Sequence, residues 1–154
     1  MFRKWAALAA AAAAFASPGA AQAKWYRAAT DRFVVYGEGR EAKVREMAVK
    51  LTAFDAVLRL HNPPPEGRNP RRLEVYMVGG PAELRRIAPR SRWLGGFYTA
   101  MPTGTYAAAI VRNDTSRGDD SLFHEYAHHF MLANFPAAYP GWFVEGFAEY
   151  YATV

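Results

Sequence analysis

Two histidines and a glutamate near the end of the sequence have the types and the spacing that metal-assisted hydrolysis needs. His124, Glu125 and His128 form an HExxH motif. On a helix the two histidines are one turn and about 40° apart, so both imidazoles can reach one metal ion. Glu125 lies about 100° from His124, which suits contact with the attacking water better than metal ligation. The pattern predicts a zinc site with Glu125 as the general base.

A second segment supplies a candidate for the missing ligand. A catalytic zinc takes three protein ligands and keeps one position open, and two histidines with one glutamate are a known set. Glu145 and Glu149 lie one turn apart in the apolar segment WFVEGFAEYY, so they share one face of a second predicted helix. We expect Glu145 to bind the zinc. Glu149 is then placed to accept the spare imidazole N–H of a ligating histidine, in the second shell of the metal.

These two segments, HEYAH and WFVEGFAEYY, resemble the gluzincin metallopeptidases, the thermolysin-like and aminopeptidase-like clan. The chain is more narrowly similar to bacterial exported domains called peptidase-MA-like. The resemblance is specific over residues 121–151 and general over residues 32–112. It implies that Glu145 is the third zinc ligand, that Glu149 is its second-shell partner, and that the activity is peptide-bond hydrolysis.

Other HExxH families fit less well. A metzincin carries Gly three residues and His six residues after its second ligand, where this chain has Met131 and Asn134. A peptide deformylase uses a cysteine ligand, and the sequence contains no cysteine. The lack of cysteine also excludes a disulfide framework, a thiolate zinc site and a cysteine nucleophile.

The expected mechanism uses zinc to polarise a water molecule and the substrate carbonyl, while Glu125 carries a proton from the water to the leaving amine. An oxyanion-stabilising Tyr or His is also expected, but the sequence does not assign one. His129 could take this role, but its position favours a side chain that faces solvent or contacts a metal ligand. Tyr150 and Tyr151 read as packing residues.

The N-terminal segment reads as a signal peptide. Arg3 and Lys4 precede an Ala-rich apolar run, and Ala21-Gln22-Ala23 provides a cleavage signal before Lys24. The apolar run is too short to span a bilayer, so we expect no membrane span after cleavage. The sequence thus predicts export to the periplasm or the medium. The remaining domain comprises residues 24–154.

Composition fits one globular domain, with 51% hydrophobic and 21% charged residues. The formal charge of +5 would fall by two on loss of Arg3 and Lys4. One local basic cluster lacks the aromatic pattern of a nucleic-acid site and reads as a solvated face. We expect a peptide or protein substrate and no nucleic acid. The cluster consists of Arg85, Arg86, Arg90 and Arg92.

Hydrophobic periodicity and turn residues predict the order β-α-β-α-β-β-α-α. We therefore expect an α+β domain, with a small twisted, mostly antiparallel sheet followed by an active-site helix and a second ligand-bearing helix. The resemblance makes the strand at 106–112 the sheet edge along which a peptide lies, and an ordinary core strand is the alternative. The predicted strands are 32–37, 73–78, 95–100 and 106–112, and the predicted helices are 41–60, 81–88, 121–134 and 142 onward.

Two questions stay open at this level. The sequence stops within the last predicted helix, whereas members of the clan continue past the third ligand, so the chain is a fragment, a truncated gene product or a minimal domain. Its function also has two rivals to a zinc metallopeptidase. One is a peptidase-like binding module that holds zinc without cleaving its partner, and the other is a structural envelope domain with a chance HExxH.

Overall fold

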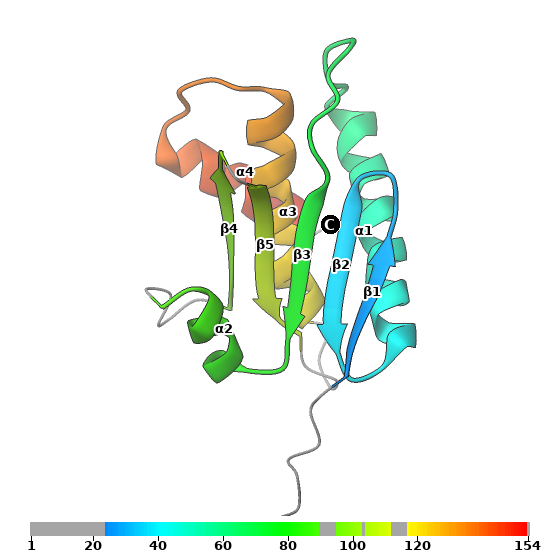
Figure 1. The fold of residues 1–154 in the computed structure, drawn as a ribbon. Coiled ribbons are helices and arrows are strands. Elements are labelled where there is room, and N and C mark those ends of the chain that lie inside the picture. Colours follow the sequence, from blue (N-terminus) through cyan, green and yellow to red (C-terminus); the bar gives the residue numbers. More distant parts are fainter. Residues whose placement is uncertain (1–23, 90–94, 103, 112–116, 154) are drawn as a thin grey trace, which may run out of the picture.

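A computed structural model describes residues 24–89, 95–102, 104–111 and 117–153. Its centre is a five-stranded sheet with strand order β1-β2-β3-β5-β4. Three helices, α1, α3 and α4, lie on one side of this sheet, and α2 lies near the end of β4 and β5 (Figure 1). The elements are β1 (Trp25–Ala29), β2 (Phe33–Glu38), α1 (Glu41–His61), β3 (Leu73–Val78), α2 (Pro81–Ile87), β4 (Gly96–Met101), β5 (Gly104–Ile110), α3 (Arg117–Asn134) and α4 (Gly141–Ala152).

The sheet is mixed. The outer pairings, β1 with β2 and β4 with β5, are antiparallel, whereas β2–β3 and β3–β5 are parallel. Parallel neighbours need a crossover, which α1 provides after β2, and α2 together with β4 provides after β3. The predicted α+β class is confirmed. The expectation of a mostly antiparallel sheet is wrong, because the helices return the chain to the same end of the sheet.

Strand β1 and the start of α3 depart most from the sequence prediction. Strand β1 was not predicted, because it is short and only two of its five residues, Tyr26 and Ala28, pack against the core. Helix α3 begins at Arg117 rather than at residue 121. Acidic Asp119 and Asp120 lie in this first turn, where the helix dipole favours negative charge. Residue 112 of the strand predicted at 106–112, and Arg90 and Arg92 of the basic cluster, lie outside the described residues.

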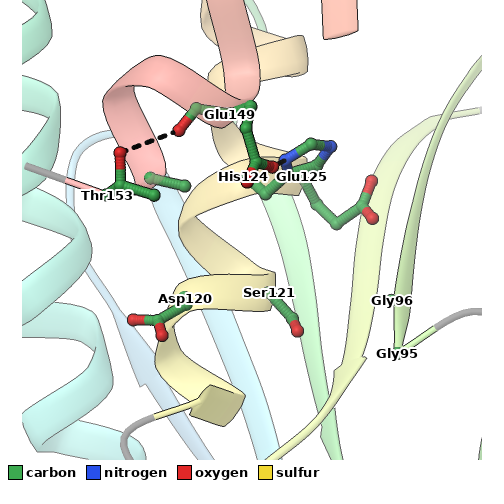
Figure 2. A pocket seen from close by; sticks show the side chains of 9 residues that line it. Gly95, Gly96, Asp120, Ser121, His124, Glu125, Glu149 and Thr153 are labelled. Carbon is green, nitrogen blue, oxygen red and sulfur yellow. Dashed lines mark hydrogen bonds and ion pairs between the residues drawn. The ribbon is translucent and has the colours of Figure 1, made fainter. Parts of the chain in front are cut away.

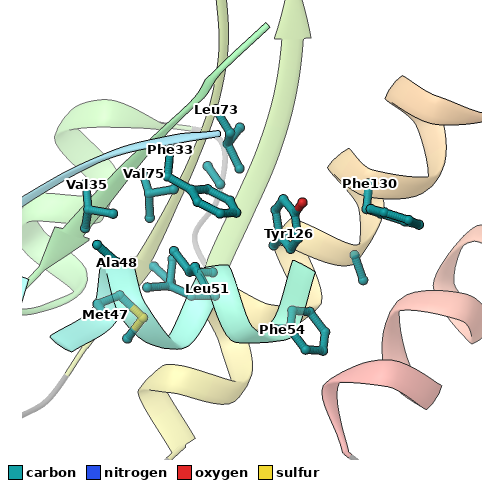
Figure 3. Close-up of a cluster of buried hydrophobic side chains, with 14 of the residues drawn as sticks. Phe33, Val35, Met47, Ala48, Leu51, Phe54, Leu73, Val75, Tyr126 and Phe130 are labelled. Carbon is teal, nitrogen blue, oxygen red and sulfur yellow. The ribbon is translucent and has the colours of Figure 1, made fainter. Parts of the chain in front are cut away.

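The main core lies between the sheet and helices α1, α3 and α4 (Figure 3). Strand β2 contributes Phe33 to it, and its ring packs edge-on against Tyr126 of α3 at 4.9 Å between ring centroids. Burial of such large side chains supplies most of the driving force that holds α3 against the sheet. Its other large members include Leu51, Phe54, Leu58, Leu73 and Phe130.

Strand β5 is an interior strand with small side chains. Ala107 and Ala109 are buried in the main core, and Ala108 packs with Leu84 of α2 on the opposite face. The alternative of an ordinary core strand is therefore confirmed for residues 104–110, and the predicted sheet edge there is wrong. The edge beside α3 is β4. The alanines leave room for α3 to approach the sheet, not for a substrate backbone.

Among the described helices, none combines the length and the apolar character that a membrane crossing requires.

Candidate metal centre

Helices α3 and α4 bring the predicted ligands together. The short connection at residues 135–140, with Pro136 and Pro140, turns the chain so that α4 begins at Gly141 and packs against α3. Pro140 has an extended backbone, as expected for a residue that precedes a helix. As predicted from their spacing, His124 and His128 lie one turn apart on α3. Glu145 approaches both of them from α4.

The three candidate ligand atoms form a nearly regular triangle. Nε2 of His124 and Nε2 of His128 are 3.1 Å apart. Oε2 of Glu145 lies 3.4 Å from the first nitrogen and 3.5 Å from the second. In a tetrahedral zinc site with bonds of about 2.0–2.1 Å, ligand atoms are about 3.3 Å apart. The donor set and its spacing therefore fit a zinc ion with one coordination position left open.

The chemistry of His128 also fits a cation. Its side chain is buried, and no described residue accepts or donates a hydrogen bond at its Nδ1. Burial lowers the pKa of His128, with a smaller opposing contribution from Glu145 and a further lowering by His124. A neutral imidazole presents a nitrogen lone pair. Two such lone pairs that face one another beside a carboxylate repel, and a shared cation would turn this repulsion into attraction.

Glu149 lies one helical turn after Glu145 on α4, and its carboxylate faces His124. Its Oε2 is 3.4 Å from Nδ1 of His124, and Figure 2 shows these two side chains close to one another. This geometry suits the predicted second-shell role, in which the carboxylate fixes the histidine tautomer and leaves Nε2 to the metal. Thr153 ends α4 by donating its hydroxyl to the backbone oxygens of Glu149 and Tyr150.

Glu125 stands apart from the ligand triangle and faces the sheet. Burial raises its pKa to about 7, and the nearby charge of Glu145 adds to this shift. A carboxyl group with such a pKa can both accept and release a proton near neutral pH, which is what a general base that later acts as an acid requires.

Two cavities adjoin the ligand triangle. The first, which we call the Ser121 cavity, has a volume of about 300 Å³ (Figure 2) and is lined by Gly95, Gly96, Asp120, Ser121, His124, Glu125, Glu149, Ala152 and Thr153. The second, which we call the Tyr98 cavity, has a volume of about 370 Å³ and is lined by Gly96, Phe97, Tyr98, His124, Glu125, His128, Leu132, Val144 and Glu145. His124 and Glu125 line both, so the candidate centre lies where the cavities meet.

His129 is not the solvent-facing residue that the sequence suggested. Only 5% of it is exposed, because it points toward the sheet. Its Nδ1 lies 3.4 Å from Oη of Tyr98 on β4. Burial lowers the pKa of His129 to about 4, so the ring is neutral at physiological pH. Sequence reasoning missed Tyr98, since one aromatic residue on a predicted strand looks like ordinary packing.

Of the two tyrosines assigned to packing, one behaves as predicted. Tyr151 is buried, and its hydroxyl accepts a hydrogen bond of 2.8 Å from Nδ2 of Asn62. Tyr150 is largely exposed, although its ring contacts Tyr151.

No protein-family model matches the chain, and no curated protein matches it either. The assignment of a function therefore rests on the residues and geometry of this centre.

Proposed function

We propose that this protein is a zinc-dependent metallopeptidase, with His124, His128 and Glu145 as zinc ligands and Glu125 as the general base. The observation that carries the proposal is the triangle of ligand atoms, with sides of 3.1, 3.4 and 3.5 Å, next to the half-buried carboxyl group of Glu125. A structural helix pair has no need of two converging imidazoles and a carboxylate. Glu149 serves as the second-shell partner of His124.

The bound zinc would act as a Lewis acid that polarises the substrate carbonyl and the attacking water. Glu125 accepts a proton from that water while the water oxygen bonds to the carbonyl carbon. The same proton then passes to the amide nitrogen as the C–N bond breaks, which leaves one carboxylic acid and one amine.

The place for the substrate backbone is the free edge of β4. Among the described strands, β4 pairs only with β5, so its other side keeps unpaired N–H and C=O groups. Gly96 and Tyr98 of this strand line the Tyr98 cavity beside Glu125. An extended peptide that adds to this edge as a further strand would bring its amide bonds to the ligand triangle.

We also propose that this protein acts outside the cytoplasm. Residues 1–23, the predicted signal peptide, lie outside the described residues. We place the domain of residues 24–154 in the periplasm or the medium, after cleavage behind Ala23. A cysteine-free chain with a histidine–carboxylate zinc site suits an oxidising compartment, because it has no thiol to oxidise.

A second candidate function is a peptidase-like binding module of the cell envelope that holds zinc without turnover. The observation that favours it is the openness of the centre, since the side chains of Glu145 and Glu149 are 68% and 74% exposed. Efficient hydrolysis usually needs a site that excludes bulk water around the reacting groups.

Zinc content and peptidase activity, measured together, separate these functions. The wild type should carry stoichiometric zinc and cleave members of a broad peptide library. Glu125→Gln should keep the zinc and lose about 10²- to 10⁴-fold in activity. Glu66→Gln, at an exposed loop position, is the matched control and should behave as the wild type.

Full activity in Glu125→Gln, or a wild type that binds no zinc, would sink the peptidase proposal. Stoichiometric zinc without turnover in the wild type would favour the binding module.

A further inference from the structure

Strand β4 contacts α3 through two pairs of residues, Gly96 with Glu125 and Tyr98 with His129. Gly96 and Tyr98 are alternate residues and so face the same side of the sheet, while Glu125 and His129 are one turn apart on α3. A Cβ atom built on Gly96 would lie 3.2 Å from Cγ of Glu125. One step along both elements, Oη of Tyr98 lies 3.4 Å from Nδ1 of His129. The strand therefore contributes a phenol next to the general base.

Tyr98 lines the cavity that the substrate of the proposed peptidase would enter. Tyr98 lines the Tyr98 cavity together with Glu125 and all three candidate zinc ligands. It is the only phenol among the described residues that line this space. Other tyrosine hydroxyls near α3 are engaged elsewhere. Tyr126 donates its hydroxyl to Asp55, and Tyr151 receives a hydrogen bond from Asn62.

Amide hydrolysis places negative charge on the carbonyl oxygen as the carbon becomes tetrahedral. A fixed hydrogen-bond donor aimed at this oxygen stabilises the transition state more than the bound substrate. A phenol can accept one hydrogen bond and donate another at the same time. A neutral imidazole with its proton on Nδ1 would therefore hold the Tyr98 oxygen and leave the phenolic proton for the substrate.

We propose that Tyr98 is a catalytic residue that donates a hydrogen bond to the developing oxyanion, and that His129 is the positioning residue that orients its hydroxyl. The proposal rests on the peptidase function above. Tyr98 keeps its proton throughout, so no bond is made or broken at this residue. The role explains why a histidine of α3 is buried against the sheet, where it binds no metal in the proposed site.

The direct test is Tyr98→Phe in the zinc-loaded protein, with Tyr106→Phe on the neighbouring strand as the matched control. Zinc content, kcat and KM are measured on a peptide that the wild type cleaves. Calorimetry also measures the affinity for a phosphonamidate dipeptide, whose tetrahedral anionic group mimics the intermediate, and for a product dipeptide.

Tyr98→Phe should retain zinc and change KM by less than about threefold, while kcat falls about 10²- to 10³-fold. Affinity for the phosphonamidate should fall by a similar factor, and affinity for the product dipeptide should stay within about twofold. Tyr106→Phe should match the wild type in every measurement. His129→Leu should reproduce the loss in kcat, and His129→Asn, whose side-chain amide can still donate to the phenol, should restore part of it.

An active wild type with unchanged kcat and phosphonamidate affinity in Tyr98→Phe would overturn the catalytic role of Tyr98 alone. An equal weakening of both dipeptides would overturn it too, because a merely structural role has that signature. Unchanged kcat in both His129 variants would overturn the positioning role. A wild type without zinc or turnover overturns the proposed function, and this role with it.

Discussion

The environment of Glu125 disfavours the charged form of its carboxyl group. It is largely removed from water, lies near the charge of Glu145, and consequently has a pKa of about 7 instead of the ordinary value near 4.5. Proteins often lose stability at such positions, because an environment that shifts a pKa for catalysis also destabilises the charged form of the group in the folded state. His128, with a buried nitrogen that lacks a described partner, carries a similar cost. At the residue scale, a cation bound near Glu125 and His128 would lower the free energy of both groups.

This cost can be measured in the metal-free protein. The folded-state pKa of Glu125 is higher than its unfolded value, so folding stability falls as the pH rises from about 4.5 to about 7. Glu125→Gln removes the charge and should raise the Tm of the chelator-treated protein at pH 8 by a few degrees. At pH 4 the variant and the wild type should differ little. Thermal unfolding at both pH values checks this, and an equal Tm at pH 8 would contradict the buried charge.

At the scale of the elements, the close approach of β4 to α3 depends on a glycine. A Cβ atom at position 96 would lie 3.0 Å from Cβ of Ala109 and 3.1 Å from the backbone oxygen of Ala108, as well as 3.2 Å from Glu125. Backbone atoms cannot yield as a flexible side chain does. Gly96 therefore lets β4 approach the side chain of Glu125 to within van der Waals contact.

Gly96→Ala should consequently lower both stability and activity. Overpacking of this kind costs about 1–3 kcal/mol, and displacement of Glu125 should reduce kcat more than tenfold at saturating substrate. Gly104→Ala, in the paired strand, is the control, because a Cβ there meets nothing within 4 Å. Chemical denaturation and kinetics on both variants provide the measurement. The idea fails if the two substitutions have equal effects.

The two ligand helices were predictable from the sequence, and the strand that faces them was not. Four-residue spacing fixes His124 and His128 on one face and Glu145 and Glu149 on another, whatever the rest of the chain does. Which strand lies beside Glu125 depends on sheet order, which a single sequence does not encode locally. That is why β5 was assigned to the edge and why Tyr98 and the buried position of His129 were missed. The short β1 was missed because only Tyr26 and Ala28 among its five residues pack against the core.

At the scale of the whole molecule, one buried carboxylate ties three elements together. Asp55 of α1 is 4% exposed and accepts hydrogen bonds from Tyr126 of α3, from Arg59 one turn away at 2.8 Å, and from Arg32 just before β2 at 2.8 Å. Tyr126 is the residue next to Glu125. The Asp55 network therefore fixes the rotation of α3, and with it the direction of the Glu125 side chain.

Removal of this network should be costly. Asp55→Ala leaves two arginines and a buried hydroxyl without their shared acceptor and should lower the free energy of unfolding by about 2–4 kcal/mol. Arg45→Ala, which breaks the exposed pair with Glu41 on the same helix, is the control and should cost less than about 1 kcal/mol. Urea denaturation of both variants checks the difference. Similar losses in the two variants would show that Asp55 is no more than a surface-type ion pair.

Metal binding should also be visible in the stability of the whole chain. A ligand that binds only the folded state, at a free concentration about 100 times its Kd, adds about 2.7 kcal/mol. Chelation of zinc should thus lower the Tm of the wild type by several degrees, and added zinc should restore it. In His128→Ala the Tm should respond little to either treatment. A wild-type Tm that is insensitive to chelator and zinc would argue against a folded-state metal site.

Zinc affinity is the measurement that tests the central claim most directly. Competition with a chelator of known affinity should give stoichiometric, tight binding in the wild type and in Glu66→Gln. Glu149→Gln should weaken binding by about 10- to 100-fold through loss of its contact with His124. Glu145→Gln should weaken it further, since it replaces a ligand. Equal zinc affinity in Glu145→Gln and the wild type, or no stoichiometric zinc in the wild type, would contradict the His124–His128–Glu145 centre.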